Sequence, residues 1–307
     1  MDRTNRDFVR FVSWVSAHLL AYAAIAVAIR YLSSHVNIIE IGMIRSVGSL
    51  LISGVLLQLG ASSAKSGRPQ ITEDVLRSLL HLIGSLALIW SVANLSLVYV
   101  ATIEFVGPLF AAVVGWFFGR QLPGRTSAVG LAVIALGSAM LLQSQGVTGD
   151  IRIMMPVLAV MLLTTTNLML ARLARTRRVA SIIFVMHAIQ FPAYLALLTW
   201  LSPDWGSALL ARAGTWTTTE WACVAASCFA LSVAGFVTQA ALANASRHGT
   251  PLQLCAADII RLPLIALVGL VVFHEMLDMT LVVPGLIVLA GSVIAALPSR
   301  SGSAVRA

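Results

Sequence analysis

The sequence predicts an all-α integral membrane protein, with ten transmembrane helices arranged as two inverted five-helix repeats. Three observations support this fold class: long uncharged apolar runs, an internal repeat at about half the chain length, and an uneven distribution of Lys and Arg among the loops. Hydrophobic residues make up 59% of the 307 residues and charged residues only 10%, whereas soluble domains carry about 25% charged residues. This composition excludes an ordinary soluble enzyme.

Each expected helix follows from the length of one apolar run. A transmembrane helix needs about 20 mostly apolar residues, because each residue adds about 1.5 Å and the hydrocarbon layer is about 30 Å thick. The runs lack the alternation of barrel strands and are about twice as long as such strands, which excludes a transmembrane β-barrel. The expected spans are 11–30, 39–59, 78–95, 98–119, 126–145, 153–172, 180–201, 221–244, 252–274 and 281–298.

An internal repeat relates the two halves of the chain. The segment 107–122 (GPLFAAVVGWFFGRQL) matches the segment 262–277 (LPLIALVGLVVFHEML) at an offset of 155 residues. The identical pairs are Pro108 and Pro263, Leu109 and Leu264, Ala111 and Ala266, Val113 and Val268, Phe118 and Phe273, and Leu122 and Leu277. Duplicated membrane units are a common plan of transporters. The predicted units are 1–145 and 146–299, followed by a cytoplasmic tail at 300–307.

The basic residues predict the orientation of the helices. With the N-terminus inside, fifteen of the 20 Lys and Arg residues fall on cytoplasmic loops, and only Arg30, Arg152 and Arg212 fall on outer loops. This asymmetry follows the positive-inside rule, so both termini are expected in the cytoplasm, and the net charge of +8 does not indicate a nucleic-acid partner. The cytoplasmic set is Arg3, Arg6, Arg10, Lys65, Arg68, Arg77, Arg120, Arg125, Arg172, Arg175, Arg177, Arg178, Arg247, Arg300 and Arg306. Because five helices is an odd number, the second half must enter the membrane from the opposite side.

Small residues predict close helix packing. Gly115 and Gly119 form a G-x-x-x-G motif, which indicates either packing within the fold or a homodimer face, so a monomer and a homodimer are both open. Beyond the two repeat segments, Gly130 corresponds to Gly285 at the same offset, and Gly137 lies one residue from the position of Gly291. No metal-ligand cluster or phosphate-binding loop occurs, so no cofactor is expected.

The repeat segments resemble a known family. The Pro108-Leu109-Phe110 start, the apolar helix, the turn at 119–125 and the Gly-containing helix after it look like the EamA repeat of the drug/metabolite transporter superfamily. The second copy resembles it as well, from Pro263 through Glu275. The resemblance covers nearly the whole chain and implies a ten-helix transporter in a bacterial inner membrane. One departure is that the acid kept as Glu275 is replaced by Arg120 in the first copy.

Five charged residues fall within the expected spans, where a charge costs about 2.5–3.5 kcal/mol on insertion scales. We expect Arg45 to pair with Glu104 and Asp258 to group with Arg261, both lining one central cavity. An alternative is that Asp258 and Arg261, three residues apart, only neutralise each other on one helix face. Glu40 lies near the interface, and Glu275 is expected to be an outer-surface group.

Amphipathic side chains form two stripes with helical spacing. Trp14 lies four residues from His18 and eight from Tyr22 on the first span, and Trp90 lies four residues from Asn94 on the third. Such stripes either line a cavity or pack against a neighbouring helix. Trp14, Trp90 and Asn94 therefore join Arg45, Glu104, Asp258 and Arg261 as candidate substrate-binding residues.

The predicted function is secondary transport of a small metabolite by alternating access, with possible proton coupling. The family resemblance favours efflux of an amino acid or related solute. Uptake of a vitamin, a nucleoside or an adenosylated metabolite is the alternative, and a non-transporting membrane sensor or scaffold is a remote one. A membrane enzyme is not expected, because no nucleophile–base pair or metal set is visible at membrane depth.

Overall fold

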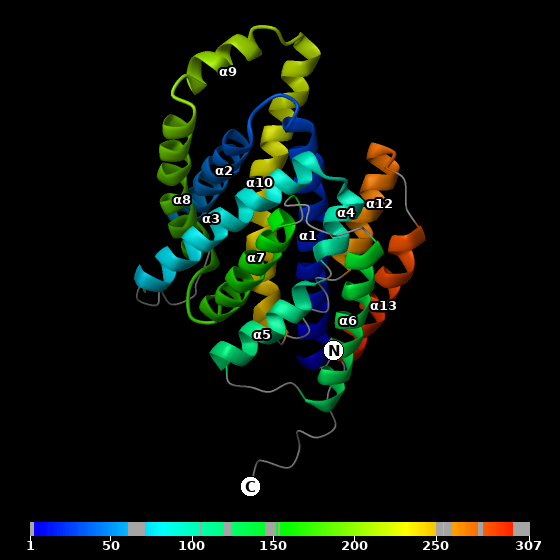
Figure 1. Cartoon of the computed structure of the whole chain (residues 1–307). Helices are drawn as coiled ribbons and strands as arrows, with labels where there is room; N and C mark the ends of the chain where they lie inside the picture. The colour runs from blue at the N-terminus through cyan, green and yellow to red at the C-terminus, as the bar shows by residue number, and fades with distance from the viewer. Residues whose placement is uncertain are drawn as a thin grey trace.

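A computed structural model of the chain describes residues 3–60, 71–104, 106–119, 124–144, 152, 154–249, 254, 260–275 and 279–296. Asp258 and Arg120, singled out above, lie outside these residues. The described part is helical and contains no strand (Figure 1). The helices are α1 (Arg3–Leu32), α2 (Ile38–Gln58), α3 (Ile71–Asn94), α4 (Leu97–Glu104), α5 (Gly107–Gly119), α6 (Arg125–Ser144), α7 (Met154–Leu173), α8 (Val179–Leu201), α9 (Trp205–Ala213), α10 (Thr218–His248), α12 (Arg261–Phe273) and α13 (Met279–Ala296).

Six of the described helices are long and apolar enough to cross a membrane. They are α1, α2, α3, α7, α8 and α10, and shorter apolar segments occur in α6, α12 and α13. The all-helical membrane architecture expected from composition is therefore confirmed. Each of these helices lies within a few residues of its predicted span, except that α1 and α3 begin seven or more residues earlier.

Two differences from the predicted spans have identifiable causes. The fourth span, expected as one helix, is divided into α4 and α5, and Pro108 is the second residue of α5. Proline has no N–H to donate and is tolerated in the first turn of a helix, so it favours a new start there. The loop expected at 202–220 contains the short helix α9, which lies at the end of the molecule opposite the N-terminus (Figure 1).

The helices pack mainly in four pairs. In Figure 1, α1 lies along α10, α6 along α13, α2 along α8 and α3 along α7. The main buried apolar cluster includes Ile25, Ile29 and Leu32 of α1 with Ile89 and Val92 of α3. Each of the four helix pairs joins one helix from residues 1–145 with one from residues 146–299.

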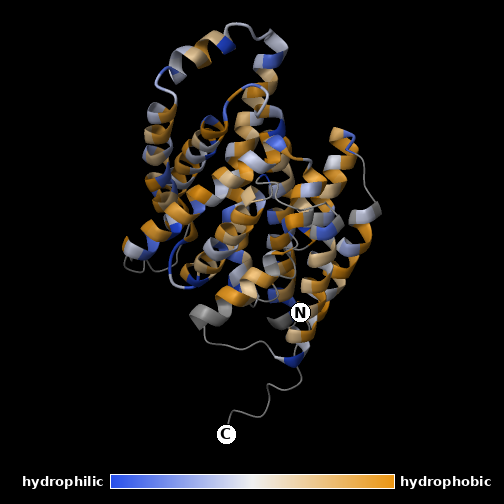
Figure 2. Ribbon diagram, viewed as in Figure 1, coloured by the Kyte–Doolittle hydropathy of each residue, from blue (hydrophilic) through white to orange (hydrophobic). Residues whose placement is uncertain are grey.

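The distribution of polarity is the reverse of a soluble protein. Large apolar side chains such as Leu20, Leu51, Trp200 and Phe229 are exposed, and apolar residues cover the helix faces in Figure 2. Many polar and charged side chains are instead buried inside the bundle. Lipid offers no hydrogen-bond partner, so polar groups must find partners within the protein. The arrangement is that of a multi-pass membrane protein.

Glycines bring α6 and α13 into backbone contact. A Cβ on Gly130 would lie 2.3 Å from the backbone N of Ala295, and a Cβ on Gly291 would lie 2.8 Å from the backbone N of Ile134. These obstacles are backbone atoms, which a side-chain rotation cannot remove. The close packing expected of Gly130 and Gly291 is confirmed, and Gly130 faces Gly291 and Ala295.

Replacing Gly130 with alanine should separate α6 from α13 and destabilise the protein. Overpacking of this kind costs about 1–3 kcal/mol, so we expect Gly130→Ala to lower the melting temperature in detergent by several degrees. Gly206→Ala on α9 is the matched control, because a Cβ there has no neighbour within 4 Å. Equal melting temperatures for Gly130→Ala and the control would contradict this account of the helix crossing.

Candidate functional site at the end of α4 and the start of α12

Two helix ends meet at corresponding positions of the internal repeat. Helix α4 ends at Glu104 and α5 begins at Gly107, while α12 begins at Arg261 after a turn at Ile260. The offset of 155 residues places Gly107 on position 262, one residue from the start of α12. Interruptions at matching positions of two related membrane helices are a pointer to a binding site, because free helix ends present polar groups at membrane depth.

Glu104, Arg261 and Tyr22 form one buried cluster at this position. The Tyr22 hydroxyl donates to Glu104 Oε1 at 2.7 Å, and Arg261 Nη2 lies 3.4 Å from Glu104 Oε2. The Arg261 guanidinium also stacks over the Tyr22 ring, with 4.2 Å between Cζ and the ring centroid. The Glu104 side chain is only 4% exposed and that of Arg261 14%. Two residues chosen as membrane-depth charges are thus brought together.

Both charges lie at helix ends. Glu104 is the last residue of α4, three residues before the start of α5, and Arg261 is the first residue of α12. The two side chains compensate each other's charge, and the Tyr22 hydroxyl donates to the carboxylate. An ion pair of this kind can exchange partners with a charged solute, because a carboxylate can replace Glu104 on Arg261 and an ammonium can replace Arg261 on Glu104.

The expected pairing of Arg45 with Glu104 is wrong. Arg45 of α2 donates from Nη2 to His81 Nε2 of α3 at 3.4 Å, whereas the partner of Glu104 is Arg261. His81 in turn contacts Gln190 of α8, with 3.0 Å between Nδ1 and Nε2. Sequence distance along one helix indicated the depth of Arg45, but it contains no information on which neighbour its side chain meets.

Sequence analysis misplaced one arginine and missed the burial of another. Arg77 was assigned to a loop but lies in α3 and is 2% exposed. Arg177 lies in the loop between α7 and α8, where it was expected, but it is only 5% exposed. Arg77 Nη2 donates to Gln239 Oε1 at 3.0 Å, and Arg177 Nη1 lies 2.7 and 2.9 Å from the two carboxylate oxygens of Asp74. The sequence did contain a signal for the burial of Arg77: it lies four residues before His81, and this spacing places both side chains on the same face of a helix.

The remaining predicted binding residues lie away from this cluster. Trp14 is 38% exposed on α1, and Trp90 is half-buried on α3. Asn94 is exposed, and its amide donates to the backbone oxygen of Trp90 at 2.8 Å. In the described part of the chain, no group of three or more His, Cys, Asp or Glu residues could hold a metal ion.

The Glu40 side chain, expected near the interface, is buried. It is 1% exposed and forms a capping box with Asn37 at the start of α2. Arg212 of α9 donates to both of its carboxylate oxygens, at 3.0 and 3.2 Å. The interface position predicted for Glu40 is compatible with this pair, which ties α9 to α2.

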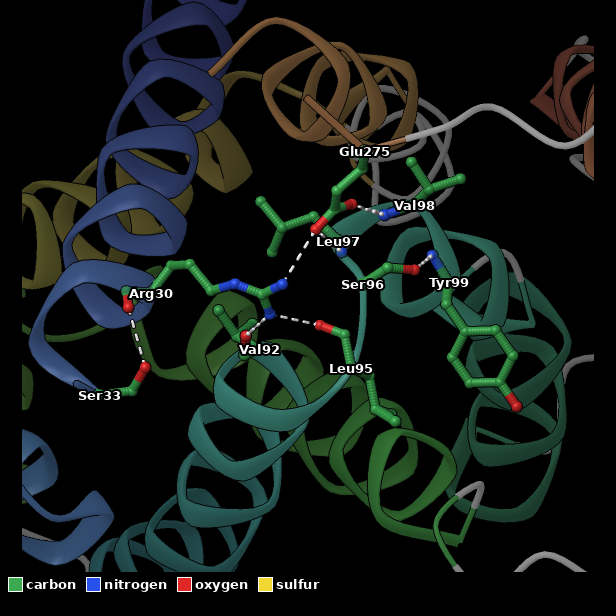
Figure 3. Close-up of polar contacts among 9 residues, drawn as sticks. All are labelled: Arg30, Ser33, Val92, Leu95, Ser96, Leu97, Val98, Tyr99 and Glu275. Atoms are coloured by element: carbon green, nitrogen blue, oxygen red, sulfur yellow. Dashed lines mark hydrogen bonds and ion pairs between the residues drawn. The ribbon is translucent and has the colours of Figure 1, made fainter. Parts of the chain in front are cut away.

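Glu275, expected at the outer surface, is instead the centre of a network of hydrogen bonds, called here the polar knot (Figure 3). Its carboxylate accepts hydrogen bonds from the backbone N–H groups of Leu97 at 3.0 Å and Val98 at 3.2 Å, and from Arg30 Nη2 at 3.1 Å. A carboxylate at a helix N-terminus is favourable, because it satisfies free N–H groups and complements the dipole of α4. The side chain of Glu275 is only 10% exposed.

Arg30 extends this knot to the end of α3. Its Nη1 donates to the backbone oxygens of Val92 at 2.7 Å and Leu95 at 2.6 Å, which lie in and after the last turn of α3 (Figure 3). His274, in the left-handed region at φ 51°, turns the chain after α12 so that Glu275 follows directly. The contacts join α1, α3, α4 and the segment after α12, a set that sequence spacing does not relate.

Residues 10–143 match the EamA-like transporter family. The chain also resembles a solved structure titled "Crystal structure of protein", with a TM-score of 0.62 and 14% identity, over 94% of this chain and 97% of that chain. At that identity the likeness establishes a shared fold alone. No curated protein matches the chain. The family resemblance predicted from the repeat segments is thus supported over the first part of the chain, and it implies a membrane transporter of small solutes.

Removing the Glu275 carboxylate should loosen the knot in Figure 3. Glu275→Ala leaves the Leu97 and Val98 N–H groups and the Arg30 guanidinium without their acceptor, and each unsatisfied buried group costs about 1–3 kcal/mol. We therefore expect a melting temperature several degrees below the wild type in detergent. Glu220→Ala, at the exposed capping box of α10, is the control and should have a smaller effect. Equal losses would show that the Glu275 contacts add nothing beyond an ordinary helix cap.

Proposed function

We propose that this protein is a secondary transporter that moves a small metabolite across the bacterial inner membrane by alternating access. In this proposal the halves 1–145 and 146–299 are inverted five-helix repeats, and the solute binds at Tyr22, Glu104 and Arg261. The observation that carries the proposal is the Glu104–Arg261 ion pair. It joins one residue from each half, next to the starts of the matching helices α5 and α12.

The packing of the helices supports a two-fold relation between the halves. If α1, α2 and α3 correspond to α7, α8 and α10, the α1–α10 contact has its counterpart in α7–α3, and the α2–α10 contact in α8–α3. The α2–α8 and α6–α13 contacts each pair a helix with its own counterpart. Ten spans with an odd number per half make this relation an inverted one.

The ion pairs support a rocking motion of one half against the other. Each ion pair between described residues joins the first half to the second. Glu40–Arg212 joins the start of α2 to α9, and Asp7–His248 joins the N-terminal part of α1 to the last turn of α10. Opening one end would break its pairs, while the pairs at the other end keep the halves joined.

The charges of the central cluster fit a zwitterionic solute. A carboxylate would bind Arg261, and an ammonium group would bind Glu104 and the Tyr22 hydroxyl, so that the solute replaces the contacts between the two halves. This chemistry supports an amino acid or a related compound. Glu104 can also bind a proton, which provides a route for proton coupling. The direction, efflux, rests on the family resemblance. The cytoplasmic position of both termini rests on the distribution of basic residues.

The transporter proposal is tested by flux measurements in proteoliposomes. A panel of amino acids, vitamins and nucleosides is screened with and without a proton gradient, and we expect saturable flux of at least one amino-acid-like solute. Loading the vesicles from either side then distinguishes efflux from uptake. The absence of saturable flux for every solute would overturn the transporter proposal.

The site itself is tested by Glu104→Gln and Arg261→Ala. We expect each variant to retain its helical content and to lose at least about tenfold in flux, because one half of the ion pair is missing and its partner charge is left buried. Arg172→Gln is the matched control, since it also removes one arginine but at an exposed side chain of α7 that forms none of the ion pairs between described residues. Wild-type flux in folded Glu104→Gln and Arg261→Ala would show that the cluster has a structural role and does not bind the solute. A sensor or scaffold would also not need these two side chains for transport.

A further inference from the structure

A second group of polar side chains, which contains none of Tyr22, Glu104 and Arg261, lies on α2, α3, α8 and α10. All of its members are at most 7% exposed, and they come from both halves of the chain. The group, called here the cationic cluster, consists of Arg45, Arg77, His81, His187, Gln190 and Gln239. Coulombic interactions link its two histidines with its two arginines, which places the four side chains in one region.

The cationic cluster has an excess of positive charge. Arg45 and Arg77 have no ion-pair partner among the described residues, and the nearby carboxylate of Asp74 is already bound by Arg177. The hydrogen bonds of Arg77 go to neutral oxygens, Gln239 Oε1 at 3.0 Å and the backbone oxygen of Thr166 at 3.4 Å. Buried charges are normally paired, because the apolar interior penalises an isolated ion. In the part of the chain that the structure describes, the charges of Arg45 and Arg77 are therefore not matched by carboxylates of their own.

The cationic cluster also has too few hydrogen-bond acceptors. His81 Nε2 faces Arg45 Nη2 at 3.4 Å and Gln239 Nε2 at 3.2 Å, while His81 Nδ1 faces Gln190 Nε2 at 3.0 Å. A neutral imidazole offers only one acceptor nitrogen, so the N–H groups around the ring outnumber the positions that can accept them. Gln190 Nε2 already uses one N–H on the backbone oxygen of Ser78. An added acceptor would relieve this imbalance.

Several buried polar atoms of this region have no hydrogen-bond partner among the described residues. They are Arg45 Nε, Ser49 Oγ and His187 Nε2. Arg45 Nε and Ser49 Oγ converge at one place on α10, because a Cβ on Gly235 would lie 3.2 Å from the first and 3.3 Å from the second. Unsatisfied buried groups of this kind cost about 1–3 kcal/mol each.

We propose that the cationic cluster binds a small anionic group, either a carboxylate or an inorganic anion such as chloride. Guanidinium, amide, hydroxyl and imidazole donors are the groups that bind such anions through charge-assisted hydrogen bonds. The bound anion compensates Arg45 and accepts hydrogen bonds from the unpartnered Arg45 Nε and Ser49 Oγ. The site is distinct from Glu104 and Arg261, and its occupancy is measured without transport.

The test measures thermal unfolding of the purified protein in neutral detergent at constant ionic strength and pH. Sodium gluconate, whose anion is bulky, is replaced stepwise by sodium chloride or by sodium acetate. A ligand that binds the folded state raises its melting temperature in a saturable manner. We expect an increase of several degrees with at least one of the small anions. A response to acetate alone assigns the site to a carboxylate, and a response to chloride assigns it to an inorganic anion.

Arg45→Gln gives the decisive comparison. Because it removes a buried charge whose one hydrogen bond is long, we expect this variant to melt at a higher temperature than the wild type in gluconate and to lose the response to the small anions. A purely structural arginine predicts the opposite, a lower melting temperature and no anion dependence in either protein. The control Arg212→Gln should keep the wild-type response, since its guanidinium is 40% exposed.

His187→Gln provides a second variant that keeps both arginines. It replaces the unpartnered Nε2 and should raise the half-saturating concentration of the effective anion by about tenfold, which corresponds to the loss of one charge-assisted contact. The proposal is overturned if the wild type shows no saturable response, or if Arg45→Gln and His187→Gln both respond with the wild-type half-saturation.

Discussion

The apolar solvent around the helices forces each charged side chain at membrane depth to find its partner inside the bundle. Lipid supplies no hydrogen bonds and does not stabilise ions, so the polar contacts set which helices lie together. Here the ion pairs between described residues all connect the first half of the chain with the second. Apolar packing stabilises each helix pair, but the charges specify how the two halves meet.

These contacts form layers along the bundle with different chemistry. Near the α9 end, Glu275 binds backbone N–H groups and Arg30, which fixes helix ends. Elsewhere, Glu104 and Arg261 form an ion pair at the end of α4 and the start of α12, to which Tyr22 adds a hydrogen bond. Glu104 and Arg261 meet through their side chains, whereas the Glu275 carboxylate also binds backbone N–H groups.

Sequence analysis located the helices well because the length of an apolar run is a local property. It also identified Glu104 and Arg261, since a charge within a long apolar run stands out. It failed where the answer depended on three-dimensional neighbours: Arg45 was paired with the wrong residue, and Arg77 was placed in a loop because counting began at the uncharged run from 78. The division between α4 and α5 was visible in Pro108, but apolar length outweighed that signal.

The two repeat segments carry side chains of opposite chemistry at one matched position. The Glu275 carboxylate accepts hydrogen bonds from the N-terminal N–H groups of α4. The offset of 155 residues places Arg120 at the corresponding position of the first repeat. A guanidinium has only donors, so it cannot satisfy the N–H groups at a helix start. The hydrogen bonds that the Glu275 carboxylate accepts therefore cannot be reproduced by an arginine at the matched position.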